Sequence, residues 1–321
     1  MIIKSADDKS PQIAALQTIF ARPDITVDTK KRIEQEIKNI KAGLKGEHEA
    51  AYEMNFHYKD SDNWALIHDL RIECDGRVAQ IDHIVINRLM EMWVCESKNF
   101  SEGIAINEHG ECSQFYANKP RGIASPFEQN SKHIAVLESL FNKGLVKLPT
   151  RLGFSIKPTI NSLILVSKNA RISRPKTKVV GIETIIKNDQ FKAHIGKHQD
   201  GDNNPVNIAK LIGSDTLKNF AIKLAEMHTP INIDYYAKFG VTRVAVTHLE
   251  PKKASLDNLP AQSINKPIQS DAKLVDTQDK KKECICNKCG AKVSYVVAKF
   301  CWNNVAKFGG NAFCMDCQKT L

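Results

Sequence analysis

The chain has 321 residues, enough for two or three domains, and 42% of them are hydrophobic. Its 46 lysine and arginine residues exceed the 36 aspartate and glutamate residues, which gives a formal net charge of +10. Such a balance suits an anionic partner, most often nucleic acid and next an anionic membrane surface. No stretch approaches the roughly 18 apolar residues of a transmembrane helix, and the first residues lack an apolar signal core. We therefore exclude a membrane-spanning class and expect a cytoplasmic protein.

Two helices are predicted near the N-terminus. An apolar cluster over residues 13–20 indicates a short helix, and Asp28 is a candidate cap for a second helix with an apolar stripe. Gly43 and Gly46 are expected to loosen that second helix. We treat residues 1–43 as an N-terminal helical segment.

Two strongly apolar, β-branched runs follow, at residues 80–86 and 92–98, and both are typical of buried strands. If they pair as a hairpin that turns midway between them, Asp82 lies directly opposite Glu96. The period of two along a strand then places Lys98 on the same face as Glu96. The sequence therefore predicts that two carboxylates and one ammonium group converge on a single spot of a core sheet.

Such groups are costly to bury unless they bind something. Carboxylates with water and substrate phosphate are the ligands that Mg²⁺ prefers, and a neighbouring lysine can position a water or offset charge on a phosphate. This chemistry is metal-assisted hydrolysis of a phosphodiester. The alternative is that Asp82 caps the start of a strand and that Glu96 and Lys98 form an ordinary ion pair.

Four motifs, in this order, resemble the NERD (nuclease-related domain) family of the PD-(D/E)xK nuclease superfamily. They are Gly46-Glu47, Gln80-Ile81-Asp82-His83, Glu96-Ser97-Lys98-Asn99 and Pro126-Phe127-Glu128-Gln129-Asn130. The resemblance covers about residues 44–170. It implies an α/β, restriction-endonuclease-like fold, in which helices flank a mixed sheet, and a nuclease site that depends on Mg²⁺ or Mn²⁺.

The resemblance also implies roles for particular residues. Asp82, Glu96 and Glu47 would bind the metal, Lys98 would act beside them, and Gln129 would position the lysine or a phosphate. For Glu47 the alternative is a solvated helix residue. His83 should point to the opposite face of its strand and is expected to be structural.

Further elements are predicted around these motifs. Ser125 is placed to cap a helix that starts at Pro126, where Glu128 would complete a capping box. His133, on that helix, is as well explained by a buried structural role as by a functional one. The remaining expected elements are a strand over residues 64–72, a turn at Asp75-Gly76, a sheet extension over 103–107, a closing strand over 160–166 and a helix over about 215–227.

Near the C-terminus, two Cys-x-x-Cys pairs have the spacing of one tetrahedral zinc site: Cys286, Cys289, Cys314 and Cys317. The segment is too short for an independent apolar core, so bound zinc would supply its folding free energy. It resembles the zinc ribbons appended to bacterial topoisomerases. Cys284 and Cys301 are left over, and substitution of either for a ligand is a minor alternative.

Within this ribbon, Trp302 and Lys307 are candidates for stacking on bases and contacting phosphates. The alternative is that its aromatic residues fill a small core. We expect five segments: the helical segment 1–43, the nuclease-like domain 44–170, an α/β extension 171–250, a flexible linker 251–283 and the zinc ribbon 284–321.

The sequence thus predicts a Mg²⁺-dependent nuclease, with DNA as its substrate and a zinc ribbon that binds nucleic acid. A helicase or another repair or defence protein is a conceivable partner. Two alternatives come from other classes: a DNA-binding protein that has lost turnover, and a zinc-stabilised adaptor between proteins.

Overall fold

The computed structural model describes residues 1–151, 153–200, 210–243, 284–293, 297–298, 301 and 308–318. The chain divides into two compact units, residues 1–247 and 248–321. The expected segments 1–43 and 44–170, together with residues 171–247 of the expected extension, therefore lie within one unit. Trp302, Lys307 and the expected linker 251–283 lie outside the described residues.

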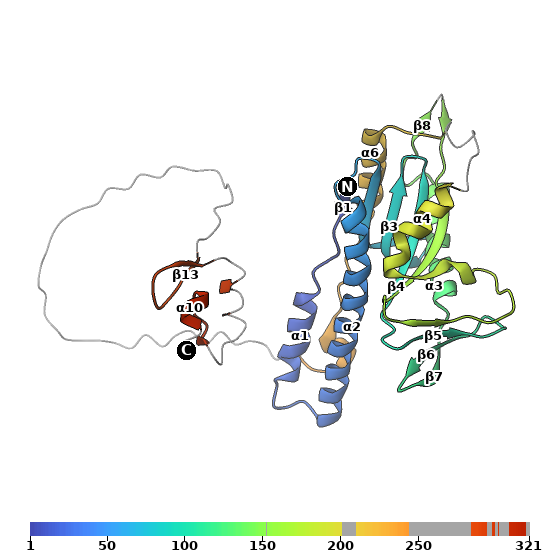
Figure 1. Ribbon diagram of the computed structural model, residues 1–321. Coiled ribbons are helices and arrows are strands. Elements are labelled where there is room, and N and C mark those ends of the chain that lie inside the picture. Colours follow the sequence, from blue (N-terminus) through green and yellow to red (C-terminus); the bar gives the residue numbers. More distant parts are fainter. Residues whose placement is uncertain are drawn as a thin grey trace, which may run out of the picture. The chain divides into compact units, whose positions relative to one another are not determined.

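The larger unit is built on a six-stranded mixed sheet with the strand order β1-β2-β3-β4-β10-β12 (Figure 1). Its strands are β1 (Ile2–Lys4), β2 (Trp64–Cys74), β3 (Arg77–Asn87), β4 (Glu91–Lys98), β10 (Thr159–Val166) and β12 (Ile185–Lys187). The central strands β2, β3 and β4 are antiparallel to one another, whereas β1, β10 and β12 run parallel to their neighbours. The predicted α/β class, a mixed sheet flanked by helices, is confirmed.

The predicted strands and their turn are also present. Asp75 and Gly76 both have positive φ angles, 56° and 67°, as a tight turn between β2 and β3 requires. The strand predicted to close the sheet is β10, but it is not the edge strand, because β12 pairs alongside it. That pairing involves only three residues of β12, which is too short a run to stand out in the sequence.

The second helix differs from the prediction. α1 (Ser10–Phe20) is followed by α2 (Val27–Tyr58), a single helix of 32 residues that passes through Gly43 and Gly46 without a break. Its cap is Thr26, whose side chain accepts a hydrogen bond from the Thr29 amide, and Asp28 lies in the first turn instead. The helix survives its glycines because its later half packs on the sheet through Ala50, Met54 and Tyr58.

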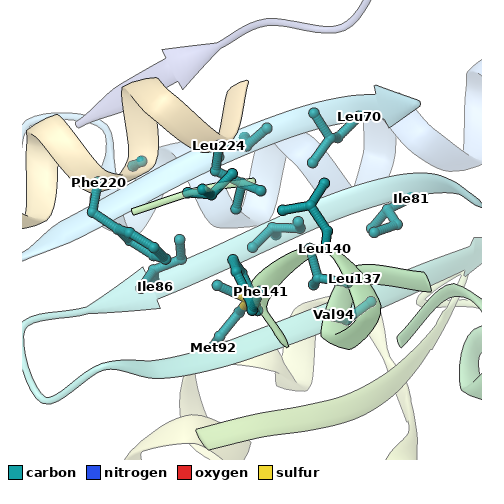
Figure 2. Packing of buried hydrophobic residues seen from close by; sticks show 14 of the residues in the cluster. Leu70, Ile81, Ile86, Met92, Val94, Leu137, Leu140, Phe141, Phe220 and Leu224 are labelled. Carbon is teal, nitrogen blue, oxygen red and sulfur yellow. The ribbon is translucent and has the colours of Figure 1, made fainter. Parts of the chain in front are cut away.

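Helices cover both faces of the sheet. α3 (Pro126–Asn142) and α6 (Ser214–Ala225) pack on one face, where Leu137, Leu140, Phe141, Phe220 and Leu224 meet Leu70, Ile81, Ile86, Met92 and Val94 of the strands (Figure 2). α2 and α4 (Phe191–Asp200) cover the other face around Trp93. α7 (Tyr235–Phe239) packs with α1 and α2 in a separate small core.

Residues 103–107 do not extend the main sheet as predicted. β5 (Gly103–Ile106) belongs to a second sheet with the strand order β11-β5-β6-β7, completed by β6 (Cys112–Tyr116), β7 (Lys119–Ile123) and β11 (Arg171–Ser173). Gly103 adopts a φ of 129°, and a Cβ there would lie 2.1 Å from the Arg171 carbonyl oxygen. This close approach lets the chain leave β4 and pair with β11.

The alternation of side chains slips at one point in β2 and at the facing point in β3. On the α3 face, β2 contributes Ala65, Ile67, Leu70, Ile72 and Cys74, and β3 contributes Ala79, Ile81, Ile84 and Ile86. The spacing is two throughout, except between residues 67 and 70 and between residues 81 and 84. Each of these steps contains one extra residue. The pairs His68–His83 and Leu70–Ile81 bracket the slip, so Asp69 and Asp82 face each other within it.

The remaining elements are short. They include β8 (Thr150–Arg151), β9 (Phe154–Ser155), η1 (Ile182–Thr184) and η2 (Asn188–Gln190) in the larger unit, and β13 (Cys284–Ile285), β14 (Lys292–Val293) and α10 (Met315–Gln318) in the smaller. None of the helices in the described part of the chain combines the length and the apolar character needed to cross a bilayer.

Candidate functional site

The predicted register of the hairpin is confirmed. The last pair of the β3–β4 ladder is His83 with Cys95, so Asp82 and Glu96 are opposed in the next step. The Oδ2 of Asp82 accepts a hydrogen bond from the Ser97 amide at 2.7 Å, and this bond holds the carboxylate of β3 against the backbone of β4. Glu96 is only 3% exposed, although it carries a carboxylate.

Lys98 lies on the same face as Glu96, as its spacing predicts. Its Nζ is 2.7 Å from Oε1 of Glu96 and donates to Oε1 of Gln129 at 2.9 Å. Gln129 also hydrogen-bonds the Glu96 carboxylate. Glu96 and Gln129 thus hold the ammonium group of Lys98 in place, and the lysine side chain is still 27% exposed to solvent.

α3 supplies Gln129 because its first turn is anchored twice. Ser125 caps the helix by accepting from the Glu128 amide, as predicted. Asn130 is fully buried, and its Nδ2 donates to the Val94 carbonyl at 2.9 Å and to the Ser162 hydroxyl at 2.8 Å. These bonds tie the start of α3 to β4 and β10, so Gln129 is positioned by the core of the fold.

Four carboxyl groups from three strands and a helix influence one another. Burial raises the pKa of Asp82 well above its usual range, and the nearby Glu96 and Glu47 raise it further. Burial also raises the pKa of Glu96, against the opposing effect of Lys98. The pKa of Glu47 is raised by burial and then by Asp69. The site is therefore short of positive charge.

Carboxylate oxygens are the ligand type that a hard divalent cation prefers, but within the described residues the four cysteines form the only group of three or more ligand atoms close enough together to share an ion. Oε2 of Glu96 is buried and has no hydrogen-bond partner among the described residues. Nδ1 of His133 lies 3.4 Å from that oxygen and is also without a hydrogen-bond partner there. Burial lowers the pKa of His133 to about 4, so the imidazole is neutral at physiological pH and does not balance the carboxylate. Glu96 therefore offers one unsatisfied buried carboxylate oxygen, a ligand type that Mg²⁺ or Mn²⁺ accepts, near the acids Asp82 and Glu47.

Glu47 reaches this region because α2 docks on the end of β4. Gly46 is buried there, and a Cβ on it would lie 3.0 Å from the Cβ of Asn99. Nδ2 of Asn99 donates to the Ala42 carbonyl at 2.9 Å, which fastens the helix to the residue after Lys98. The contact between Gly46 and Asn99 thus joins two of the sequence motifs, and it sets where Glu47 lies relative to Lys98.

Asp69 joins the acidic cluster without having been predicted. It lies within the slip of β2, is 3% exposed and has a φ of 53°, which is unusual for a residue other than glycine. Its Oδ2 accepts from Lys9 at 2.6 Å and its Oδ1 accepts from Gln80 at 3.2 Å. The one signal in the sequence is an aspartate inside an apolar strand.

His83 is buried and contacts another histidine, in agreement with the structural role that was predicted for it. Its Nδ1 lies 2.8 Å from Nδ1 of His68, whose Nε2 lies 3.0 Å from Oδ1 of Asn55. Asn55 accepts, so Nε2 of His68 carries the proton, and Nδ1 of His68 then accepts from His83. Burial lowers the pKa of His68 to about 4 and that of His83 well below its usual range, in keeping with two neutral rings.

In the smaller unit, ligand atoms of Cys286, Cys289, Cys314 and Cys317 all lie within 4.8 Å of one another. The cluster fits a small zinc ribbon, as predicted. Cys301 is fully buried outside the cluster, where its sulfur accepts a hydrogen bond from the Phe313 amide at 3.4 Å. Cys301 therefore packs in the interior of this unit and is not one of the four clustered sulfurs.

Residues 42–167 match the family model of the nuclease-related domain, NERD. The matched range includes all five residues predicted for the site: Glu47, Asp82, Glu96, Lys98 and Gln129. No curated protein and no solved structure matches the chain.

Proposed function

We propose that this chain, which carries a nuclease-related domain at residues 42–167, is a metal-dependent nuclease that hydrolyses phosphodiester bonds of DNA. The observation that carries the proposal is the juxtaposition of Asp82 and Glu96 across the β3–β4 ladder, with Lys98 paired to Glu96. A buried cluster of acids this short of positive charge is costly to a fold that binds nothing there.

Asp82, Glu96 and Glu47 would hold Mg²⁺ or Mn²⁺. A bound divalent ion polarises a phosphoryl oxygen and makes a coordinated water more acidic. Asp69 adds negative charge next to Glu47 without a free oxygen, since Lys9 and Gln80 occupy its carboxylate. It would tune the affinity of Glu47 for the ion.

Lys98 would act on the phosphate or on the attacking water. Glu96 and Gln129 restrict its ammonium group to one position, and its partial exposure leaves a side open to substrate. A positioned cation beside a phosphate offsets the charge that develops in the transition state. Gln129 is then a positioning residue, because it acts through Lys98.

DNA as the substrate is supported by the net charge of +10 and by the four-cysteine cluster, which would hold Zn²⁺ in a module that anchors the nuclease on nucleic acid. A weak second contact would raise the local concentration of the nuclease on its substrate.

The test is a cleavage assay of the purified full chain on plasmid and on oligonucleotides, with Mg²⁺, with Mn²⁺ and with a chelator. We expect metal-dependent cutting, which Lys98→Ala lowers by about 100-fold or more while DNA binding persists. Lys223→Ala, at an exposed lysine on α6, is the matched control and should cut normally. Equal cutting by the wild type and Lys98→Ala would refute the assignment, and binding without cutting would indicate a protein that has kept the fold and lost turnover.

A further inference from the structure

A groove of about 560 Å³ lies along α2, between this helix and the chain that follows β10 and β12. Residues that line it include Lys41, Lys45, His48, Tyr52, Lys168 and Asn188. None of them belongs to the carboxylate cluster. The groove is therefore a second feature of the same unit, and the proposed reaction does not account for it.

Three lysines and two glutamates line the groove, so its charged side chains carry an excess of one positive charge. Lys41, Lys45 and Lys168 are exposed. Of the two acids, Glu49 accepts from the Ser167 hydroxyl at 3.0 Å through Oε2, and its Oε1 lies 3.9 Å from Nζ of Lys45 at the exposed end of that side chain. Three exposed ammonium groups along one groove suit a ligand with regularly spaced negative charges.

Two aromatic rings continue the same side of the helix. Tyr52 and Phe56 are 64% and 68% exposed, and their ring centroids lie 6.2 Å apart with an interplanar angle of 31°. Residues 41, 45, 48, 52 and 56 follow one another at helical spacing, so this stripe runs for roughly 22 Å. Exposed rings next to lysines form the kind of surface on which unpaired bases stack.

Asn188 adds a buried hydrogen-bond acceptor to the groove. It is 4% exposed, and its Oδ1 has no hydrogen-bond partner among the described residues. A buried acceptor of this kind is costly unless a donor reaches it. The Watson–Crick edges of unpaired bases carry such donors, whereas in a duplex these donors are already bonded to the opposite base.

The groove adjoins the carboxylate cluster. β10 runs parallel to β4 with Val166 beside Lys98, and Lys168 comes two residues later at the same edge of the sheet. On α2, Gly46 packs against Asn99, the residue after Lys98. Lys45, which lines the groove, is the residue before Gly46. A chain bound in the groove would therefore enter next to the proposed catalytic lysine.

We propose that this groove binds a single-stranded nucleic acid, with its phosphates on Lys41, Lys45 and Lys168 and a base stacked on Tyr52 or Phe56. The inference rests on the proposed nuclease function and deepens it, because it assigns single strands as the preferred substrate class. A duplex cannot use the two rings, since its bases are already stacked and paired.

The test uses the full chain with Lys98→Ala, so that the probe is bound and not cut. Fluorescence anisotropy would measure its affinity for fluorescein-labelled oligothymidylate and oligouridylate of roughly sixteen nucleotides, and for a duplex of the same length. Tyr52→Ala and Phe56→Ala should each weaken single-strand binding by about fivefold or more and leave duplex binding within about twofold. The DNA and RNA arms show which sugar the groove accepts.

Two matched variants control for loss of an exposed side chain: Tyr116→Ala, at a tyrosine that is 71% exposed on β6, and Lys223→Gln on α6. Both should bind like the parent, whereas Lys45→Gln should reduce the salt dependence of single-strand binding. Unchanged single-strand affinity in both aromatic variants would overturn the proposal. Cleavage by the chain with Lys98 intact is measured separately, so the nuclease assignment can fail while the groove is upheld, or the reverse.

Discussion

Gly46 of α2 packs against Asn99 so closely that a Cβ on the glycine would lie 3.0 Å from the Asn99 Cβ and 3.1 Å from its amide nitrogen. Asn99 follows Lys98, and Gly46 precedes Glu47, so this one contact sets the position of the helical carboxylate relative to the strand that carries the lysine. The absence of a side chain at residue 46 is thus a requirement of the site's geometry.

Gly46→Ala should separate α2 from the end of β4. We expect a loss of about 1–3 kcal/mol in the free energy of unfolding, because backbone and Cβ atoms cannot yield as a flexible side chain would. Cleavage should fall by up to about 100-fold through displacement of Glu47. Gly43→Ala, on the exposed side of the same helix with only the Glu47 carboxylate at 3.7 Å, should instead stabilise by about 0.5–1 kcal/mol. Equal effects of the two substitutions, measured by urea unfolding and cleavage, would contradict this account.

Asp82→Asn should stabilise the metal-free protein and abolish its response to metal. Since the pKa of Asp82 is raised, its ionised form opposes folding at neutral pH, and a neutral amide of the same shape removes that cost. The melting temperature in chelator should therefore rise, the increase caused by added Mg²⁺ should disappear, and cleavage should fall by about 100-fold or more. The exposed Asp75, changed to Asn, is the control and should keep both the metal response and the activity. A variant that is less stable in chelator would show that the cluster is not under electrostatic strain.

The affinity for metal should rise with pH. Burial raises the pKa of Asp82 and of Glu96, and the ion needs both carboxylates deprotonated, so binding must displace protons over the raised range. Isothermal titration calorimetry with Mg²⁺ in buffers of different ionisation enthalpy would count the released protons. We expect proton release when the wild type binds Mg²⁺ and no binding heat from Asp82→Asn; metal binding without proton release would show that the two acids are already ionised.

His68 should make the fold sensitive to acid. Its pKa is about 4 in the folded protein and 6.5 when unperturbed, so the folded state favours the neutral ring. The resulting stability is present above pH 6.5 and is lost as the pH falls toward 4, by up to about 3 kcal/mol. Asp82 and Glu96, whose pKa values are raised, act in the opposite direction. His68→Gln should therefore lose less stability than the wild type between about pH 7 and pH 4.5 in urea unfolding. His109→Gln, at an exposed histidine, should follow the wild type.

Cys314→Ser should empty the small unit of metal. Four thiolates hold structural zinc tetrahedrally, so the wild type should carry about one zinc ion per chain by elemental analysis. Loss of one ligand should remove most of it and should weaken DNA binding without abolishing cleavage of short substrates. Cys284→Ser changes a cysteine outside the four-sulfur cluster and should retain the zinc.

The site could be predicted from the sequence where regular strand geometry holds. The β3–β4 ladder keeps one register from Ile86–Met92 to His83–Cys95, and β4 continues without a break to Lys98, so Asp82, Glu96 and Lys98 could be placed together. The cap at Ser125 followed from local chemistry in the same way. Both inferences depend on residues close in sequence, whose relation the backbone fixes.

Asp69 could not be found in this way, because the alternation of β2 breaks at that residue. The short strand β1 and the second sheet around β5 were missed for a different reason. β1 pairs with β2, and β5 pairs with β11, across roughly 60–70 residues of chain, and no local pattern specifies contacts of that range, although β5 also pairs locally with β6. The unbroken course of α2 is likewise a product of packing, which outweighs the weak helical preference of two glycines.

The matched slip in β2 and β3 limits how these two strands can change. Loss of Asp69 alone would give β2 an unbroken alternation while β3 kept its extra residue, so beyond that point paired residues of the two strands would point to opposite faces of the sheet. Only a simultaneous loss from both strands would restore an unbroken sheet, and that double deletion would remove Asp69 together with Asp82. This fold can therefore acquire a shorter, regular β2–β3 hairpin only by losing two acids of its cluster.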